Sequence, residues 1–516
     1  MSKQTSLDLG KGAPSRGSST QPSYSRRRPE STVLHKVIRE NLLTFLELVE
    51  SDTSKAALPE YVKKEFHAFL DCGLLQKGFL RVRCEDCHHE RLLAFSCRKR
   101  GFCPSCLGRK QALTTEFLME DLLPSVPIRQ YVLSFPFELR FLLAARPALL
   151  SSILAIVNRA IWALLKNKAR SSHENLQGCE LHGGSVTFIQ RWGSSLNLNC
   201  HLHILVPEGV WSCSAEQANP QAKFHPIEQP NNEEISTLCQ QIAIRCMGHL
   251  RRKGYLDEDQ INFENCEEFT QLTSIQAASI KSLIALGERV GQSVRKLGTV
   301  SHTDLNMGIK GPRCAALHGF SLHANTFCQA IERHKLRKLI SYVSRPPLAH
   351  ARIKQRENGD IVYKLKNPFH DGTTHVIFTP LEFIEKLAAL IPKPRGHLTR
   401  YAGVFSRHSN LRPLVVPHEL RARQVLVLPL EEGKEEENEK PKPNNPARIS
   451  WAKLLKKVFD IDLSTCELCK GDNIKVIAAI MNKTAIDKIL AHLGLPTEAP
   501  KLHPARAPPQ TNFDDW

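Results

Sequence analysis

Two histidines that flank a single leucine, His201 and His203, have the type and spacing to bind a metal ion together. The surrounding segment Cys200–Val206 is rich in aliphatic and β-branched residues, which predicts a β-strand. Alternate side chains of a strand share a face, so both imidazoles project to one side while Leu202 points into a core. The pair could hold a divalent cation, or both rings could be ordinary histidines on a half-exposed strand.

A second strand is expected just before this one. The segment Ser185–Gln190 shows the period-two alternation of a strand, and a short connection would make the two strands an antiparallel pair. A register that pairs Trp192 with Asn199 also sets Gln190 opposite His201, on the same face. Gln190 is therefore the candidate for a third metal ligand.

Four cysteines have the spacing of a zinc ribbon. Cys84 and Cys87 form one C-x2-C pair, Cys103 and Cys106 form another, and fifteen residues separate the pairs. Thiolates from two tight turns would complete a tetrahedral site of soft ligands, which is typical of zinc. Such a site would hold a small domain together without a large core. Cys97 could replace one of the four or serve a second ion.

The chain is strongly basic. Lysine and arginine number 70 against 52 aspartates and glutamates, a formal net charge of +18. A polyanion such as DNA is the expected partner, although charge alone also fits a basic surface kept for solubility. Five cations lie between or just after the cysteine pairs, where a bound metal would rigidify them for phosphate contacts: Arg98, Lys99, Arg100, Arg109 and Lys110.

A tyrosine close to a helix end is a candidate nucleophile. The segment Ala330–Ser344 has helical character, and a Pro-Pro pair after Arg345 should end the helix, which places Tyr342 in its last turn. Lys338 lies four residues before Tyr342 and Arg345 three after, so both can share its side of the helix. Positive neighbours favour the phenolate, which could attack a phosphodiester. A tyrosine on a basic helix could equally be a packing residue.

Composition and pattern divide the chain into several parts of the α+β class. Sixteen cysteines in a long chain whose first residues lack an apolar run indicate a reducing cytoplasm. The expected organisation is a disordered basic leader at 1–31, a helical lead-in with the zinc-binding domain at 32–125, a catalytic domain built on an antiparallel sheet at 126–425, a charged linker at 426–447, a small C-terminal module at 448–500 and a disordered tail at 501–516.

Hydrophobic periodicity predicts individual elements within these parts. We expect strands at Tyr131–Phe135, Asp360–Lys366 and Thr374–Thr379, and helices at Ala148–Leu165, Glu233–Lys253, Thr273–Leu297 and Leu381–Ile391. The apolar helix at Ala148–Leu165 contains an Asn-Arg pair and is expected to lie in a core rather than in a membrane. Cys466 and Cys469 form a lone C-x2-C pair, half a zinc site, which needs partners such as His492 or another chain.

Three motifs follow one another along the chain: the cysteine pairs, the His-hydrophobic-His motif and a tyrosine before Arg-Pro-Pro. This order resembles the HUH transposases of rolling-circle insertion sequences, the IS-ninety-one group, and especially its common-region branch with one nucleophilic tyrosine. The similarity extends from about Leu70 to Pro500, through motifs such as FSCRKRGFCPSC, FIQRWGSSLNLNCHLH, GFSLHA, YVSRPPLAHARI and RYAGVFSRHSNLRPLVVP.

The resemblance implies a metal-dependent DNA-cleaving enzyme that acts in the cytoplasm of a bacterium, at the nucleoid. In such enzymes the pair matching His201 and His203 binds Mg²⁺ or Mn²⁺ with a third polar group, here Gln190. A structural Zn²⁺ is bound separately, by the cysteine domain. Tyr342 would attack a single-stranded, hairpin-forming element end and leave a 5′-phosphotyrosine link, and self-association is possible. Two-tyrosine members carry a second tyrosine where this chain has Lys338, so a one-tyrosine mechanism is expected.

Two other functions fit the same residues. A rolling-circle replication initiator or a relaxase shares the histidine pair and the tyrosine, and hairpin-forming ends beside the gene would distinguish a transposase from it. A zinc-dependent DNA-binding protein without catalysis would bind DNA tightly and form no covalent adduct.

Overall fold

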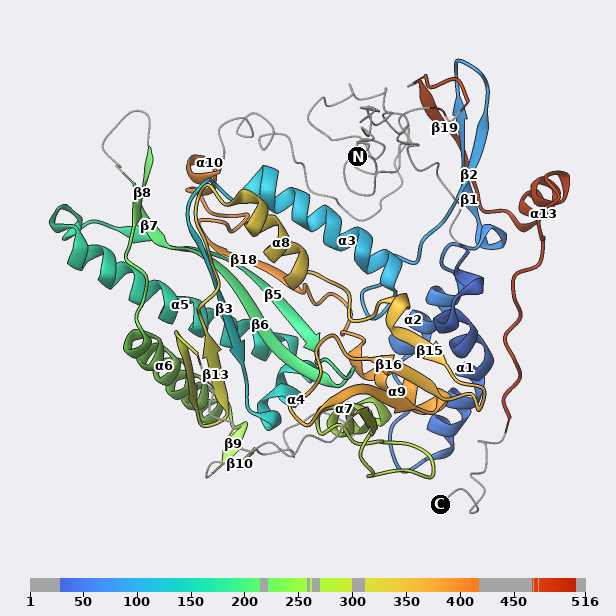
Figure 1. Ribbon diagram of the computed structural model, residues 1–516, viewed down its shortest axis with the longest axis horizontal. Coiled ribbons are helices and arrows are strands. Elements are labelled where there is room, and N and C mark those ends of the chain that lie inside the picture. Colours follow the sequence, from blue (N-terminus) through green and yellow to red (C-terminus); the bar gives the residue numbers. More distant parts are fainter. Residues whose placement is uncertain are drawn as a thin grey trace, which may run out of the picture.

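The computed structural model describes residues 28–213, 221–257, 260–261, 270–298, 311–416, 466, 468–471 and 473–506. The predicted leader before residue 28, the linker predicted at 426–447 and residues 507–516 of the predicted tail lie outside these ranges. Within them, helices and antiparallel sheets occur together, as predicted for the α+β class (Figure 1).

An antiparallel sheet forms the centre of the molecule (Figure 1). Its strands follow the order β12-β13-β3-β6-β5-β18, and β14 also pairs with β3. The bounds are β3 (Ile128–Ser134), β5 (Gly184–Trp192), β6 (Leu198–Pro207), β12 (Cys314–Leu317), β13 (Phe320–His323), β14 (Phe327–Cys328) and β18 (Thr399–Gly403). The strands predicted around the histidine pair are therefore present and lie in the middle of the sheet.

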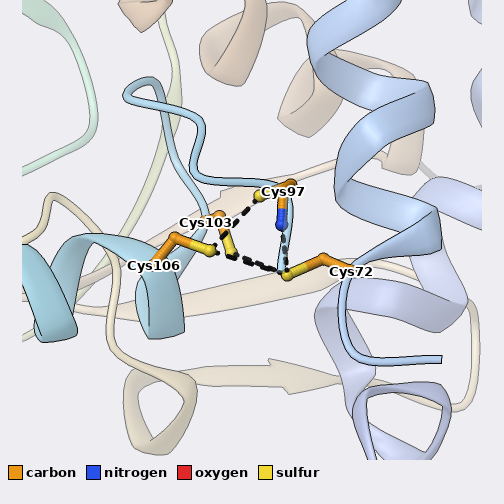
Figure 2. A group of neighbouring side chains, drawn as sticks. All are labelled: Cys72, Cys97, Cys103 and Cys106. Carbon is orange, nitrogen blue, oxygen red and sulfur yellow. Dashed lines mark hydrogen bonds between the residues drawn. The ribbon is translucent and has the colours of Figure 1, made fainter. Parts of the chain in front are cut away.

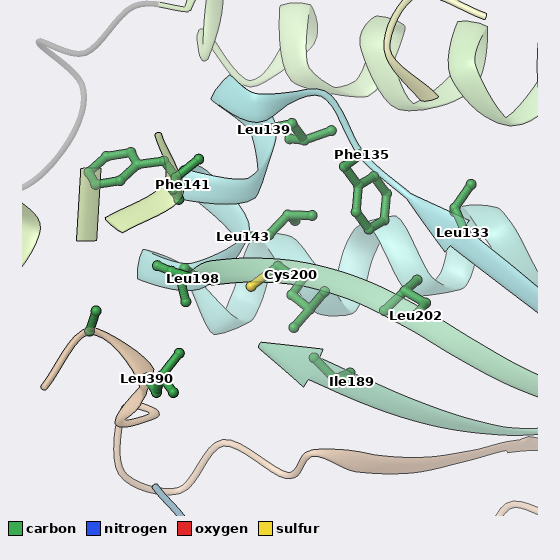
Figure 3. Close-up of a cluster of buried hydrophobic side chains, with 14 of the residues drawn as sticks. Leu133, Phe135, Leu139, Phe141, Leu143, Ile189, Leu198, Cys200, Leu202 and Leu390 are labelled. Carbon is green, nitrogen blue, oxygen red and sulfur yellow. The ribbon is translucent and has the colours of Figure 1, made fainter. Parts of the chain in front are cut away.

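One face of this sheet is packed with apolar side chains. Leu202 of β6 is paired with Leu133 of β3 and Ile189 of β5, and all three are buried in the main core (Figure 3). Helices α4 (Phe137–Ala145) and α5 (Pro147–Ser172) contribute to the same cluster. Since strand side chains alternate, the residues on either side of Leu202 must face the opposite way.

The opposite face carries the histidines and is covered by different helices. Phe188 and Leu205 on this face pack against Leu336, Ile340 and Val343 of α8 (Arg333–Val343). These helix positions are spaced by four and three residues, so they form one apolar stripe. Helix α3 (Pro104–Glu116) and the helical turn that continues it, Phe117–Leu122, lie beside α8 (Figure 1).

Helix α5 contains the apolar tract predicted to lie in a core. Within the described part of the chain, it is the one helix with the length and composition to cross a membrane. More than half of its most apolar window is nevertheless buried inside the protein, including Ile153, Val157 and Ile161, which belong to the main core. Its apolar residues are accounted for by packing on the sheet.

The helix predicted at Thr273–Leu297 is wrong in its second half. Helix α7 ends at Ile280 (Gln271–Ile280), and the chain then forms an irregular loop and β11 (Arg295–Gly298). Gly287 and Gly291 in the loop adopt φ values of +76° and +80°, which a right-handed helix does not allow. The buried carboxylate of Glu385 accepts the loop N–H groups of residues 285 and 286, so tertiary contacts replace helical hydrogen bonds.

Other predicted elements are present with small changes of boundary. The helix predicted at Glu233–Lys253 is α6 (Asn232–Arg252), and that at Leu381–Ile391 is α9 (Pro380–Leu390). The two predicted strands after the tyrosine pair as β16 and β17 in the sheet β11-β17-β16-β15. The remaining strands are β4 (Leu181–His182), β7 (Gly209–Cys213), β8 (Ala222–Pro226), β9 (Leu256–Asp257), β10 (Gln260–Ile261), β15 (Ile353–Gln355), β16 (Ile361–Lys364) and β17 (Thr373–Phe378).

The N-terminal part of the chain joins its C-terminal part in one small sheet. Helices α1 (Val33–Ser51) and α2 (Glu60–Asp71) precede a hairpin of β1 (Phe79–Cys84) and β2 (Glu90–Ala94). Strand β19 (Ile474–Ile480) pairs antiparallel with β1 and is followed by α13 (Lys483–His492) (Figure 1).

Candidate functional site

The two histidines lie on one face of β6, as the alternation predicted. Their ring centroids are 5.0 Å apart, whereas Leu202 between them is fully buried on the other face. His201 Nδ1 lies 2.9 Å from the carbonyl oxygen of Asn199, so it donates to that carbonyl and leaves Nε2 with a free lone pair. This is the arrangement of a metal-ligating histidine held by a hydrogen bond from its other nitrogen.

His203 is oriented by Gln130 of β3, a residue that the sequence analysis did not identify as part of the site. The side-chain amide of Gln130 lies 2.6 Å from His203 Nδ1, and both side chains are buried. As placed, the amide nitrogen Gln130 Nε2 donates to Nδ1; turning the amide by 180° would let its oxygen accept from Nδ1–H and would free Nε2 of His203 for a metal ion. The pairing of β3 with β6 brings Gln130 to this face. Gln130 could have been predicted as a site residue only if this strand register had been known.

Both histidines are neutral at pH 7. Burial, the neighbouring His201 and the charge of Arg345 lower the pKa of His203 to about 3. Burial also lowers the pKa of His201, with Arg140 and Arg345 acting in the same direction against the hydrogen bond to Asn199. Neutral imidazole is the form that binds metal ions, so the environment favours the ligating state.

Gln190 is paired with His201 in the register that the sequence predicted. The predicted pair of Trp192 with Asn199 is wrong by one residue, because an irregularity between Gln190 and Trp192 sets Trp192 opposite Leu198. The amide of Gln190 is buried and donates to the carbonyl oxygen of Val343 at 2.6 Å. This hydrogen bond joins the strand beside the histidines to the last turn of α8.

Tyr342 lies in that last turn of α8. Its neighbours Ile340 and Val343 are buried on the sheet, but Tyr342 itself is 43% exposed. The guanidinium of Arg345 lies 4.6 Å from the centre of the tyrosine ring, and Lys366 Nζ lies 4.0 Å from it. Lys366 was not predicted, because it follows β16 and reaches the ring only through the tertiary fold. Lys338, the other predicted neighbour, is exposed on α8.

Helix α3 fixes the position of the tyrosine helix. Gln111 donates to the carbonyl of Ser341 at 2.5 Å, and Arg337 forms ion pairs with Glu116 and Glu120. Because Ser341 immediately precedes Tyr342, α3 contacts the backbone of the candidate nucleophile. The helix begins at Pro104, between Cys103 and Cys106, so the cysteine region positions the tyrosine.

The four predicted zinc ligands do not share one site. Cys103 and Cys106 cluster with Cys72 and Cys97, and the ligand atoms of this cluster all lie within 4.8 Å of one another (Figure 2). The separations of its thiols include 3.6 Å for Cys72 and Cys106 and 3.4 Å for Cys97 and Cys106.

Cys84 and Cys87 belong to a second cluster, with Cys466 and Cys469. The reason is the β1–β2 hairpin: Cys84 and Cys87 lie at its tip, whereas Cys72 and Cys97 lie before and after its base. A strand rises about 3.3 Å per residue, so the six residues of β1 hold the two regions too far apart for one ion. Cys97, predicted to serve a second ion or to replace a ligand, is a member of the first cluster.

The five predicted DNA-binding cations lie close to this region. Arg98, Lys99 and Arg100 line one pocket together with Arg395. Arg100 and Lys110 line a second pocket with Gln190 and Arg345, which opens beside the last turn of α8. Arg109, on α3, lies outside both linings. Burial and the charge of Arg100 lower the pKa of Lys110.

The loop that carries these cations is held by a buried carboxylate. Glu65 of α2 accepts the N–H groups of Arg100 at 3.1 Å and Gly101 at 2.7 Å. Arg100 also donates to the carbonyl oxygens of Lys393 and Gly396 in the loop after α9. The cysteine region is thereby joined to the central domain through backbone contacts.

Replacing Gly101 by Ala is expected to lower the free energy of unfolding by about 1–3 kcal/mol. A Cβ at this position would lie 2.9 Å from Glu65 Oε1 and 2.9 Å from Ile391 Cγ1, so packed neighbours would have to move. Gly108→Ala is the matched control, because a Cβ there meets no atom within 4 Å and Gly108 lies inside α3. The control should gain about 0.5–1 kcal/mol. Urea unfolding measures both, and equal effects would contradict the packing described.

Comparison with known families agrees with these features. A family model described as a putative transposase matches residues 184–412, which include the histidine pair and Tyr342. A model of a transposase zinc-binding domain matches residues 44–135, which include the cluster of Cys72, Cys97, Cys103 and Cys106. No curated protein and no solved structure matches the chain.

A DNA-acting central domain and a cysteine-rich zinc-binding domain together define the chain as a transposase. The zinc-binding model is that of the IS91 family, and the chain belongs to the IS91-type transposases. Four thiols within 4.8 Å of one another match the soft, tetrahedral ligand set of structural Zn²⁺, which agrees with the zinc-binding domain.

Proposed function

We propose that this transposase cleaves and rejoins single-stranded DNA at the ends of a rolling-circle insertion sequence, with Tyr342 as the nucleophile. The observation that carries the proposal is the hydrogen bond from Gln190 to the carbonyl of Val343. Gln190 is paired with His201, and Val343 directly follows Tyr342, so this bond brings the tyrosine turn to the histidine face. Arg345 supports the same proximity, since it stacks on Tyr342 and its charge acts on both histidines.

His201, His203 and Gln190 are the residues that would hold a divalent cation, Mg²⁺ or Mn²⁺. Two neutral imidazoles fit such an ion, and the carbonyl oxygen of the Gln190 amide suits a hard cation. When bound, the cation supplies Lewis-acid polarisation of the scissile phosphate. Zn²⁺ also fits nitrogen ligands, so a metal titration is needed to identify the ion.

The proposed reaction conserves the phosphodiester energy. The phenol oxygen of Tyr342 forms a bond to phosphorus as the bond from phosphorus to the 3′ oxygen breaks. The tyrosine loses its proton, and the leaving oxygen is protonated to a free 3′-hydroxyl. Arg345 and Lys366, both at the tyrosine ring, are placed to stabilise the negative charge of the phosphate. Attack by a 3′-hydroxyl on the phosphotyrosine reverses the reaction and rejoins the strand.

The polarity of the covalent product tests this function. Single-stranded oligonucleotides that span each end of the element are incubated with the full-length protein and Mn²⁺, with label on either side of the nick. The label on the 3′ side of the nick should remain bound to the protein after denaturation. The released fragment should end in a 3′-hydroxyl that a polymerase extends. Attachment through the opposite side of the nick, or tight binding without an adduct, would contradict the proposal.

The two basic pockets are the proposed path of the DNA strand toward Tyr342. Arg98, Lys99 and Arg395 line the outer pocket, and Arg100 lines both pockets. Lys110 and Arg345 line the inner pocket beside Gln190. Consecutive phosphates of one strand could contact this series of cations, and single-strand binding proteins use such grooves.

Neutralising the path is expected to weaken binding in a salt-dependent manner. Arg98→Ala, Lys99→Ala and Lys110→Ala combined should reduce the slope of log K against log salt by about 2, because each single-strand phosphate contact contributes about 0.7. Fluorescence anisotropy with a single-stranded element end measures this slope. The control removes three charges elsewhere, at Arg159, Arg245 and Arg252 on α5 and α6, and should change the slope little. Equal losses in both variants would mean that only net charge matters.

A further inference from the structure

The second cysteine cluster joins two segments that are almost four hundred residues apart in sequence. Cys84 Sγ lies 3.5 Å from Cys469 Sγ, and Cys87 Sγ lies 3.4 Å from Cys466 Sγ. These separations are far longer than a disulfide bond of about 2.05 Å. They are close to the edge of about 3.8 Å that follows from a tetrahedron with Zn–S bonds of about 2.3 Å. The four ligand atoms all lie within 4.8 Å of one another.

The two C-x2-C loops share one backbone feature. The residue after the second cysteine adopts a left-handed φ in each loop, +58° at His88 and +63° at Lys470. Left-handed φ is uncommon for residues other than glycine, so its occurrence at the same position in both loops indicates two tight turns of one kind.

The two loops also pack closely against each other. A Cβ on Gly471 would lie 2.1 Å from Asp86 Oδ2, so any larger residue would force the Asp86 side chain of the first loop to move. Glu85 N donates to the carbonyl of Asn473 at 2.8 Å, and Lys475 Nζ lies 3.3 Å from Glu85 Oε2. The four thiols are therefore brought together by a built interface between the two segments.

We propose that Cys84, Cys87, Cys466 and Cys469 bind a second Zn²⁺ ion that fastens the C-terminal segment to the β1–β2 hairpin. Cys466 and Cys469 lie outside both matched family regions, so the zinc-binding family model does not account for this site. Four thiolates from two tight turns form a closed structural zinc site. The ion closes a loop of the chain that includes the whole central domain.

The remaining contacts of the C-terminal segment explain why it needs such a site. Strand β19 pairs with β1, but its side chains are mostly exposed or half-exposed. Helix α13 buries Ile486 and Leu490 against Leu75 and Phe79, and this cluster is small. A segment with so little buried apolar surface is held weakly by packing alone, and a metal site is the usual supplement. The ion and the apolar cluster hold opposite ends of β19.

Zinc content tests this proposal on the full-length protein. Wild type should contain two zinc ions per chain by atomic emission, and Cys466→Ser with Cys469→Ser should contain one. The control Cys179→Ser with Cys213→Ser removes two half-buried cysteines outside both clusters and should keep two ions. One ion in the wild type, or two ions in the Cys466 and Cys469 variant, would overturn the proposal.

Alkylation of the wild type gives a second test that does not depend on a variant. Cys87 and Cys469 are exposed, so iodoacetamide should modify both within minutes once the zinc is chelated. In the zinc-loaded protein their modification, followed by mass spectrometry of peptides, should slow at least 10-fold. Cys213 serves as the internal reference and should react at the same rate in both states. Equal rates for Cys87 and Cys469 with and without zinc would refute the site. Neither test depends on Tyr342 or on DNA cleavage.

Discussion

Replacing Tyr342 by Phe is expected to abolish the covalent adduct between the protein and single-stranded element ends. Phenylalanine keeps the ring beside Arg345 and Lys366 but has no oxygen to attack phosphorus. Loss of a nucleophile typically lowers the rate by roughly 10⁴-fold or more. The adduct is measured on a denaturing gel with end-labelled DNA and Mn²⁺.

A matched variant separates chemistry from folding in this experiment. Tyr255 stacks with Arg146 on the opposite side of the central sheet, so Tyr255→Phe also removes one hydroxyl beside an arginine. It should form the adduct at the wild-type rate. DNA affinity of Tyr342→Phe should stay within a few-fold of the wild type, because the phosphate-binding cations are untouched. An adduct that persists in Tyr342→Phe would show that another residue is the nucleophile.

His203→Ala is expected to slow cleavage by about 10³-fold or more and to weaken Mn²⁺ binding. Stabilisation of the transition state by a catalytic cation contributes several kcal/mol, and about 4 kcal/mol corresponds to this factor. The neighbouring ligand, His201, should behave in the same way. Mn²⁺ affinity is measured by titration of the protein alone, so the result does not depend on DNA cleavage.

His370→Ala is the control for the histidine variants. His370 is exposed in the turn between β16 and β17, which belong to a different sheet from the histidine pair. Its removal should change neither Mn²⁺ affinity nor the cleavage rate. If His203→Ala kept the wild-type metal affinity and rate, the histidine pair would have only a structural role.

Much of the sheet around the candidate site could be predicted because it depends on local pattern. The period of two in β5 and β6 sets His201 and His203 on one face, and the short connection sets Gln190 opposite His201. The end of α8 followed from the proline pair, which placed Tyr342 in the last helical turn. These features require few assumptions about the rest of the fold.

Features that depend on distant segments could not be predicted in the same way. The spacing of the cysteine pairs fitted one zinc ribbon, but the β1–β2 hairpin holds Cys84 and Cys87 at its tip, away from Cys103 and Cys106. Each pair instead clusters with two distant cysteines, Cys466 and Cys469 in one case and Cys72 and Cys97 in the other. Gln130 and Lys366 reach the site through strand pairing and loop packing that no local pattern encodes. The predicted helix at Thr273–Leu297 is wrong in its second half because hydrogen bonds to Glu385 stabilise a loop there, in spite of the helical periodicity.

Anomalous diffraction from crystals grown with Mn²⁺ tests most directly whether the tyrosine and the histidines serve one ion. We expect a single strong manganese peak at bonding distance from Nε2 of both His201 and His203, with the Tyr342 hydroxyl turned toward it. The thiol clusters should give no manganese peak, since thiolates prefer softer ions. A manganese ion bound elsewhere, or a Tyr342 hydroxyl that points away from an ion held by the two histidines, would rule out a site shared by the tyrosine and the histidine pair.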